Sequence, residues 1–169
     1  MKNIILIGMP AVGKSTLGVI LAKALGFDFV DTDLLIQKSQ GKRLQDIIDN
    51  DGIDRFLQIE EKVLCDLDLT GCIIATGGSV VYSEKAMEHL KQMGYIVYLS
   101  ATCEEIEKRL KNITTRGIVM GKGSTLKEVY DKRVPLYEKY ADTVINCTGK
   151  NMEQCVGMIV KSVGNPKNS

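Results

Sequence analysis

The sequence lacks several features by which whole classes of protein are recognised. In its 169 residues no stretch approaches the roughly 20 apolar residues of a membrane-spanning helix, and the longest apolar runs are 4–7 and 94–99. It also lacks a charge imbalance, because 22 basic and 21 acidic residues give a net charge of +1. No overall field therefore attracts nucleic acid or an anionic membrane. These absences favour a soluble protein that recognises a partner locally.

Cysteine is present, but in a pattern that argues against its usual structural uses. The five cysteines are odd in number, lie far apart and include no C-x-x-C pair, so a disulfide framework or a zinc site is not expected. The N-terminus also lacks the charged region, apolar stretch and cleavage site of a signal peptide. We therefore expect a cytoplasmic protein, and its small size and balanced charge favour a monomer. The thiols expected to be small buried side chains are Cys65, Cys72, Cys103, Cys147 and Cys155.

Apolar segments rich in strand-forming residues alternate with longer segments of helical period, which is typical of β-α units on a mostly parallel sheet. We expect one domain over residues 1–163, folded as an α/β three-layer sandwich around five strands, and a disordered tail at 164–169. The polar, glycine-rich stretch 112–125 is expected to form a mobile lid. The expected strands are 3–7, 28–31, 72–75, 96–99 and 143–146, and the expected helices are 14–24, 34–38, 44–50, 53–66, 83–93, 103–111, 126–141 and 152–163.

The strongest motif is a G-x-x-x-x-G-K-S sequence at residues 8–15, which directly follows an apolar strand and directly precedes a helix. Its glycines let the backbone curl so that successive N–H groups and the positive end of the helix face a β-phosphate. Lys14 is expected to reach the β- and γ-oxygens of ATP, and the Ser15 hydroxyl to bind Mg²⁺. An ordinary glycine-containing turn would not need Lys-Ser at its end. The expected nucleotide-binding residues of this P-loop are Gly8, Ala11, Val12, Gly13, Lys14, Ser15 and Thr16.

A P-loop predicts nucleotide binding but not the reaction. The sequence contains no N-K-x-D tetrapeptide, the element by which a GTPase reads guanine. A motor ATPase would show a later apolar strand that ends in an acid, whereas the strand at 72–75 runs into Thr76, Gly77 and Gly78. The remaining class is a kinase.

Two acids are placed where an acceptor would bind. Asp31 and Asp33 fall at the end of the second expected strand, and ligands bind at the carboxyl ends of strands in an open parallel sheet. Alternation along a strand would place both carboxylates on one side. One can then hold Mg²⁺ through water while the other accepts a hydrogen bond from a substrate hydroxyl. The alternative is that they cap the helix that follows.

These motifs together resemble the shikimate kinase family over nearly the whole chain. The resemblance implies a P-loop kinase fold and transfer of a phosphoryl group from ATP to the 3-hydroxyl of shikimate, in aromatic amino-acid biosynthesis. It implies that Asp31 helps to hold Mg²⁺, and that Asp33 binds the substrate hydroxyls and is the proposed base. Gly77 and Gly78 would contact the substrate, although the residues alone leave open a tight β-α turn.

Three arginines also fit the resemblance. Arg116, in the expected lid, matches an arginine that closes over the phosphates, where a planar cation shares the charge of the γ-phosphoryl group. Arg133 matches an arginine that contacts the substrate carboxylate. Arg109 matches a residue that packs on the adenine. For each of them an ordinary surface arginine is the alternative.

The chain departs from the family on the acceptor side. Shikimate kinases usually carry an arginine in an F-R-x-x-E segment, which clamps the carboxylate, but here Leu57 follows Phe56. A buried anion left with one partner in place of two could lose on the order of 2 kcal/mol. Arg55 is an imperfect substitute because two residues along a helix are roughly 200° apart around its axis. Ser79 also replaces the third glycine of the family's G-G-G.

Other functions stay open at this point. The changed acceptor side is compatible with a different small hydroxy acid or polyol as acceptor. A nucleoside monophosphate kinase is disfavoured, because between residues 112 and 132 the sequence offers only Arg116 to a second phosphorylated substrate. A nucleotide-binding sensor without transfer activity is disfavoured because Lys14, Ser15 and Asp33 are all present.

Overall fold

The structure, a computed structural model of the chain, describes residues 2–112, 120 and 123–164. Helices and strands alternate through these residues as the sequence predicts. The strands are β1 (Asn3–Ile7), β2 (Asp28–Asp31), β3 (Cys72–Ala75), β4 (Gly94–Ser100) and β5 (Thr143–Asn146). The helices are α1 (Lys14–Leu25), α2 (Thr32–Gln40), α3 (Leu44–Asp51), α4 (Ile53–Cys65), α5 (Glu84–Met93), α6 (Cys103–Lys111), α7 (Leu126–Tyr140) and α8 (Met152–Val163), with a 3-10 turn, η1 (Val80–Tyr82), before α5.

The five strands form one sheet in the order β2-β3-β1-β4-β5. All four neighbouring pairs are parallel, so the sheet expected to be mostly parallel is entirely so within the described residues. β1 lies in the middle and is buried at each of its positions, as expected for a strand covered on both faces. The carboxyl ends of β1, β2 and β3 therefore meet at one edge of the sheet.

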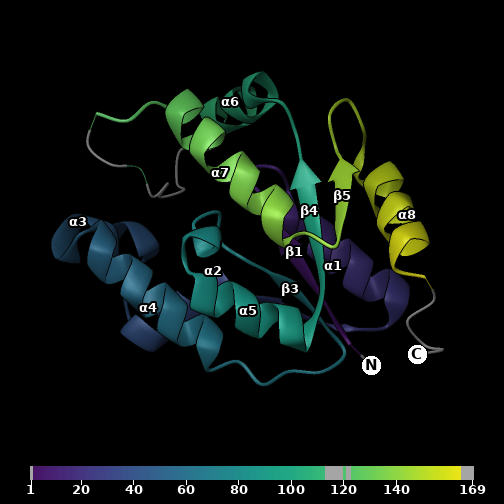
Figure 1. Ribbon diagram of the computed structural model, residues 1–169, viewed down its shortest axis with the longest axis horizontal. Helices are drawn as coiled ribbons and strands as arrows, with labels where there is room; N and C mark the ends of the chain where they lie inside the picture. Colours follow the sequence, from purple (N-terminus) through teal and green to yellow (C-terminus); the bar gives the residue numbers. More distant parts are fainter. Residues whose placement is uncertain (1, 113–119, 121–122, 165–169) are drawn as a thin grey trace.

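Helices cover both faces of the sheet, which confirms the three-layer α/β/α architecture. Helices α1 and α8 pack together on one face, and α5 and α7 pack on the other, as Figure 1 shows. Helices α2, α3 and α4 form a separate group beside the sheet, with α4 packed against α5. This group has a small hydrophobic cluster of its own, which consists of Ile36, Ile47, Phe56 and Ile59.

Strand β4 is longer than expected at both ends. Gly94 pairs with Asn3, and Tyr95 pairs with Ile4, so the strand begins two residues before the expected 96. A Cβ at position 94 would lie 2.3 Å from the Asn3 carbonyl oxygen, which means that only glycine allows this approach. The extension at the amino end of the strand therefore depends on the missing side chain at position 94.

The expected lid and tail fall largely outside the described residues. Residues 113–119, 121–122 and 165–169 are not described, so the lid at 112–125 and the disordered tail at 164–169 stay predictions. The five cysteines carry free thiols. Cys72, Cys147 and Cys155 are buried as expected, whereas Cys65 and Cys103 are only half-buried.

Asn3 joins three segments at the amino end of the sheet. Its side chain is 1% exposed. The amide nitrogen donates to the carbonyl oxygens of Leu69 and Met93, at 2.6 and 3.1 Å. The amide oxygen accepts from the backbone N–H of Cys72 at 3.0 Å. One buried amide thus pairs with three backbone groups, of which the Cys72 N–H is fully buried and the two carbonyl oxygens are partly buried.

We expect Asn3→Ala to lower the free energy of unfolding by about 2 kcal/mol or more, because it removes three hydrogen bonds and leaves the buried N–H of Cys72 unpaired. Urea unfolding followed by circular dichroism measures the loss. Asn50→Ala is the control, since the Asn50 amide is exposed and donates only to the Asp46 carbonyl. The control should change stability by less than about 0.5 kcal/mol, and an equal loss in both variants would contradict the role of Asn3.

Candidate active site

The P-loop leaves β1 and curls into α1 through residues with unusual backbone angles. Gly8 has φ 146° and Gly13 has φ 103°, both in a region that side chains rarely adopt. Ala11 has φ 65° without being a glycine, a local strain of the kind that collects at functional sites. A Cβ at Gly8 would lie 2.6 Å from the Leu99 carbonyl oxygen, so the loop packs directly on β4. The curled loop turns the helix end toward the carboxyl edge of the sheet.

Lys14 lies inside this loop rather than in solvent. The residue is 7% exposed, and its Nζ donates to the carbonyl oxygens of Gly8 and Met9 at 2.7 and 2.8 Å. The ammonium group is therefore held by the loop whose N–H groups would face a phosphate. Thr16, two residues after Lys14, is exposed on α1.

Ser15 and Asp31 form a hydrogen-bonded pair beside the loop. The Ser15 hydroxyl donates to Oδ2 of Asp31 at 2.7 Å. Oδ1 of Asp31 accepts from the N–H groups of Asp33 and Leu34, so Asp31 is the N-cap of α2. A hydroxyl and a carboxylate suit Mg²⁺, which takes few protein ligands and completes its octahedron with phosphate oxygens and water. Asp31 thus combines capping with a position suited to the metal.

The expected alternation of Asp31 and Asp33 along a strand is wrong. Helix α2 begins at Thr32, two residues before the expected start at 34, because the Asp31 carboxylate caps it there. Asp33 therefore lies in the first turn of a helix. It nevertheless reaches the site, since a Cβ built on Gly77 would stand 2.9 Å from Oδ1 of Asp33.

Arg109 contacts the P-loop from α6. Its Nη1 donates to the carbonyl oxygens of Ala11 and Val12 at 3.3 and 2.9 Å, and its Nη2 pairs with Glu105 at 2.8 Å. The guanidinium group thus holds the strained part of the loop. Its predicted contact with adenine stays a prediction.

Arg133 reaches the other side of the strand-end glycines. It is 1% exposed on α7, and its Nη1 lies 2.8 Å from the position of a Cβ at Gly78. Its Nε donates to the Tyr82 hydroxyl at 3.1 Å, and its guanidinium lies 5.2 Å from the centre of the Tyr82 ring. One helical turn later, the Tyr137 hydroxyl donates to the Gly78 carbonyl at 2.6 Å. Helix α7 is thereby fixed against the end of β3.

The glycines therefore separate an acidic side from a basic side. A side chain on Gly77 would collide with the Asp33 carboxylate, and one on Gly78 would collide with Arg133 and with Pro10 of the P-loop. Side chains from α2, α4 and α7 thus approach the backbone of these glycines closely. The expected contact of Gly77 and Gly78 with the substrate stays a prediction.

A small cavity of about 150 Å³ adjoins this site on the side of α4. Leu57 occupies the position where the family resemblance places an arginine, and it lines the cavity with Ser79 and Tyr82. Arg55 is exposed, contacts Gln58 at 3.4 Å and does not line this cavity. Whether Arg55 contacts the substrate in place of the arginine missing at position 57 stays a prediction. Arg116 lies outside the described residues.

Comparison with known proteins resolves the family. The shikimate kinase model matches residues 10–164. A shikimate kinase of Thermodesulfovibrio yellowstonii is 40% identical over 164 residues, which cover 95% of this chain and 94% of that one. The chain belongs to the shikimate kinase family.

Solved structures agree with this membership. A structure described as shikimate kinase from Acinetobacter baumannii in complex with shikimate has a TM-score of 0.89 and 28% identity, covering 96% of this chain and 93% of that one. The shikimate kinase of Aquifex aeolicus has a TM-score of 0.82 and 30% identity, with 95% of each chain covered. The predicted P-loop kinase fold and the predicted activity class, an ATP-dependent phosphotransferase that acts on a hydroxyl group, are confirmed. In the described part of this kinase, every helix is too short or too polar to cross a membrane.

Sequence reasoning gave no role to Glu60, the last residue of the segment 56–60 that was compared with the family's F-R-x-x-E. It is 2% exposed on α4, and its Oε1 accepts from the Ser79 hydroxyl at 2.7 Å, which gives Ser79 a role. Burial raises the pKa of Glu60 to about 7; the Ser79 hydroxyl lowers it, the Asp33 carboxylate raises it, and Arg133 lowers it. A signal was available, because Glu60 shares the buried face of α4 with Phe56.

We expect the raised pKa of Glu60 to make stability depend on pH. The unfolded chain releases this proton near pH 4.5 and the folded chain near pH 7, so the stabilisation present below pH 4.5 is lost as the pH rises to about 7. Relative to Glu60→Gln, the wild type should lose about 3 kcal/mol between pH 4 and pH 8.

Urea unfolding of both proteins at the two pH values measures this difference. Glu61→Gln is the matched control, because Glu61 is the next residue and also accepts from a serine, Ser83. If the wild type and Glu60→Gln respond equally to pH, Glu60 does not retain its proton on folding.

Proposed function

We propose that this kinase transfers the γ-phosphoryl group of ATP to a hydroxyl of shikimate, the 3-hydroxyl by family resemblance, with Mg²⁺ as cofactor. The observation that carries the proposal is the arrangement at Gly77 and Gly78. The Asp33 carboxylate on one side suits a hydroxyl, and the Arg133 guanidinium on the other suits a carboxylate. Pro10 of the P-loop adjoins the same glycines, so an acceptor bound there lies next to the nucleotide.

On the nucleotide side, the curled loop would present its N–H groups to the phosphates. Lys14 would exchange its contacts with the Gly8 and Met9 carbonyls for phosphate oxygens, which attract the ammonium group more strongly because they are charged. Ser15 and Asp31 would hold Mg²⁺, whose charge offsets that of the phosphate oxygens. Arg109 would stabilise the conformation of the loop through its hydrogen bonds to the carbonyl oxygens of Ala11 and Val12.

On the acceptor side, Asp33 would accept a hydrogen bond from the reacting hydroxyl and take its proton as the bond to phosphorus forms. Arg133 would hold the carboxylate of the acceptor and so orient the ring. Its own orientation is fixed by the Tyr82 hydroxyl, which lowers the entropy lost on binding. The fixed side chains place the hydroxyl before the reaction starts.

The family resemblance supplies the remaining part of this proposal. Residues 112–125 would close over the site and bring Arg116 to the transferring group. Closure would exclude water, which otherwise competes with the acceptor for the phosphoryl group. The protein would act as a monomer in the cytosol.

The deciding experiment is an acceptor panel. Purified protein with Mg·ATP is offered shikimate, other small hydroxy acids and polyols, while ADP release is followed and the product is identified by mass. Turnover on shikimate supports the proposal. Turnover on another acceptor alone would assign a changed specificity to Leu57, and turnover on none would leave a nucleotide-binding sensor.

Two variants test the assigned roles. Lys14→Ala should reduce kcat at least about 100-fold, because it removes the cation on the transferring group.

Asp33→Asn should lower the acceptor-dependent kcat by about 100-fold or more while the affinity for ATP changes little. Steady-state kinetics and nucleotide titration measure both effects. An equal loss of ATP affinity and of acceptor-dependent rate in Asp33→Asn would contradict the role of Asp33 as base.

A further inference from the structure

One carboxyl oxygen of Glu60 is directed to the proposed acceptor site and has no hydrogen-bond partner among the described residues. Its Oε1 accepts from Ser79, but its Oε2 is buried and has no hydrogen-bond partner within the described residues. Oε2 lies 2.8 Å from the position of a Cβ at Gly77, the point from which Oδ1 of Asp33 is 2.9 Å distant. Two carboxyl oxygens from different helices therefore converge on one glycine. A buried oxygen left unpaired beside a ligand site is a candidate for a ligand contact.

The surroundings make a neutral Glu60 available near physiological pH. The charged groups that face it are the Asp33 carboxylate from α2 and the Arg133 guanidinium from α7, and the Ser79 hydroxyl reaches it from the segment after β3. Burial outweighs the favourable contacts and raises its pKa to about 7. Leu57 brings no positive charge to the adjoining cavity, and the arginine expected at that position would have favoured the ionised form.

The hydrogen bond from Ser79 also determines where the proton resides. A neutral carboxyl group accepts through its carbonyl oxygen and donates through its hydroxyl oxygen. Because Oε1 accepts from Ser79, the proton belongs on Oε2. The only donor of neutral Glu60 then points to the edge at Gly77, where the acceptor is proposed to bind.

We propose that Glu60 is a specificity-determining residue, which in its neutral form donates a hydrogen bond from Oε2 to an oxygen of the acceptor at Gly77 and in its ionised form repels an anionic acceptor. The inference rests on the proposed function, because it places the acceptor at Gly77. Arg133 is then the fixed cation of the acceptor site and Glu60 its titratable donor. Such a site takes a small anion that also carries hydroxyl groups.

The first test is the KM for shikimate as a function of pH. If only neutral Glu60 binds the acceptor, the wild-type KM should rise about tenfold between pH 6 and pH 8, in proportion to the loss of the neutral form. Glu60→Gln should have a KM that changes less than about twofold over this range, because its amide can accept from Ser79 and still donate toward Gly77 without titrating. The KM for ATP, measured in the same assays, is the internal control.

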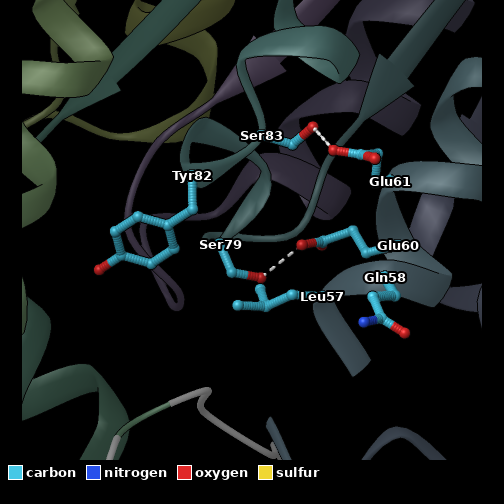
Figure 2. A pocket seen from close by; sticks show the side chains of 7 residues that line it. All are labelled: Leu57, Gln58, Glu60, Glu61, Ser79, Tyr82 and Ser83. Carbon is cyan, nitrogen blue, oxygen red and sulfur yellow. Dashed lines mark hydrogen bonds between the residues drawn. The ribbon is translucent and has the colours of Figure 1, made fainter. Parts of the chain in front are cut away.

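Glu61→Gln is the matched control variant. Figure 2 shows the two neighbouring glutamates side by side, Glu60 directed to Ser79 and Glu61 directed to Ser83. Glu61 holds the serine that caps α5 and is not one of the groups that converge on Gly77. This variant should keep the tenfold rise in the KM for shikimate.

A second measurement tests the wild-type protein directly, so its main result does not depend on whether a variant folds. At pH 8, binding of shikimate to wild-type protein saturated with ADP should take up close to one proton, since Glu60 must regain its proton to bind. Calorimetric titration in two buffers of different ionisation enthalpy counts the protons. Glu60→Gln, if folded by circular dichroism, should take up none.

The outcomes separate this inference from the proposed function. If the wild type does not phosphorylate shikimate, the proposed function fails and the inference fails with it. If the wild type phosphorylates shikimate but Glu60→Gln shows the same rise of KM with pH, the function stands and the role of Glu60 is overturned. Binding without proton uptake by the wild type at pH 8 overturns it as well.

Discussion

Close approach of backbone at the carboxyl edge of the sheet is the constraint on which the candidate site depends. At Gly8 the P-loop touches the Leu99 carbonyl, and at Gly77 and Gly78 the end of β3 lies between carboxylates and a guanidinium. A single Cβ at any of these positions would overlap a neighbour at less than 3 Å. The parallel register brings the strand ends together, and the missing side chains let polar groups from α2, α4 and α7 meet there. Without that approach, the same residues would surround an ordinary helix-sheet interface.

The sheet and the P-loop could be predicted from sequence because their signals are local. Four strands have the expected bounds, and the order of glycines, Lys14 and Ser15 after an apolar strand defines the loop. The start of α2 was left open, because the sequence allowed Asp31 either to extend the strand or to cap the helix, and the structure shows that it caps. The contact of Arg109 with the P-loop could not be predicted, because α6 is almost 100 residues away in sequence. The place of Glu60 on the buried face of α4 could be predicted from the helical period, but its raised pKa could not, because that follows from burial in the packed structure.

The site divides its charges between two structural layers. Lys14 and Ser15 stand in the first turn of α1, directly after the P-loop, whereas Asp33 and Glu60 come from helices beside the sheet. Arg133 reaches in from α7 and is held by the Tyr82 hydroxyl, so this buried cation has a fixed position beside Gly78. Preorganised charge of this kind interacts strongly in a site from which water is excluded, and it needs little rearrangement during reaction. The arrangement therefore favours accuracy of positioning over adaptability.

The small cluster of Ile36, Ile47, Phe56 and Ile59 gives the helices beside the sheet a supporting core separate from the main one. Both acidic residues of the acceptor side stand on these helices, while the phosphate-binding loop stands on the sheet. Helix α4 also packs against α5, and its Leu64 belongs to the main core, so the group is joined to the rest of the molecule at this helix. A shift of these helices would displace Asp33 and Glu60 together and leave the P-loop in place. The groups proposed to bind the acceptor and the loop that binds phosphate therefore rest on different hydrophobic clusters.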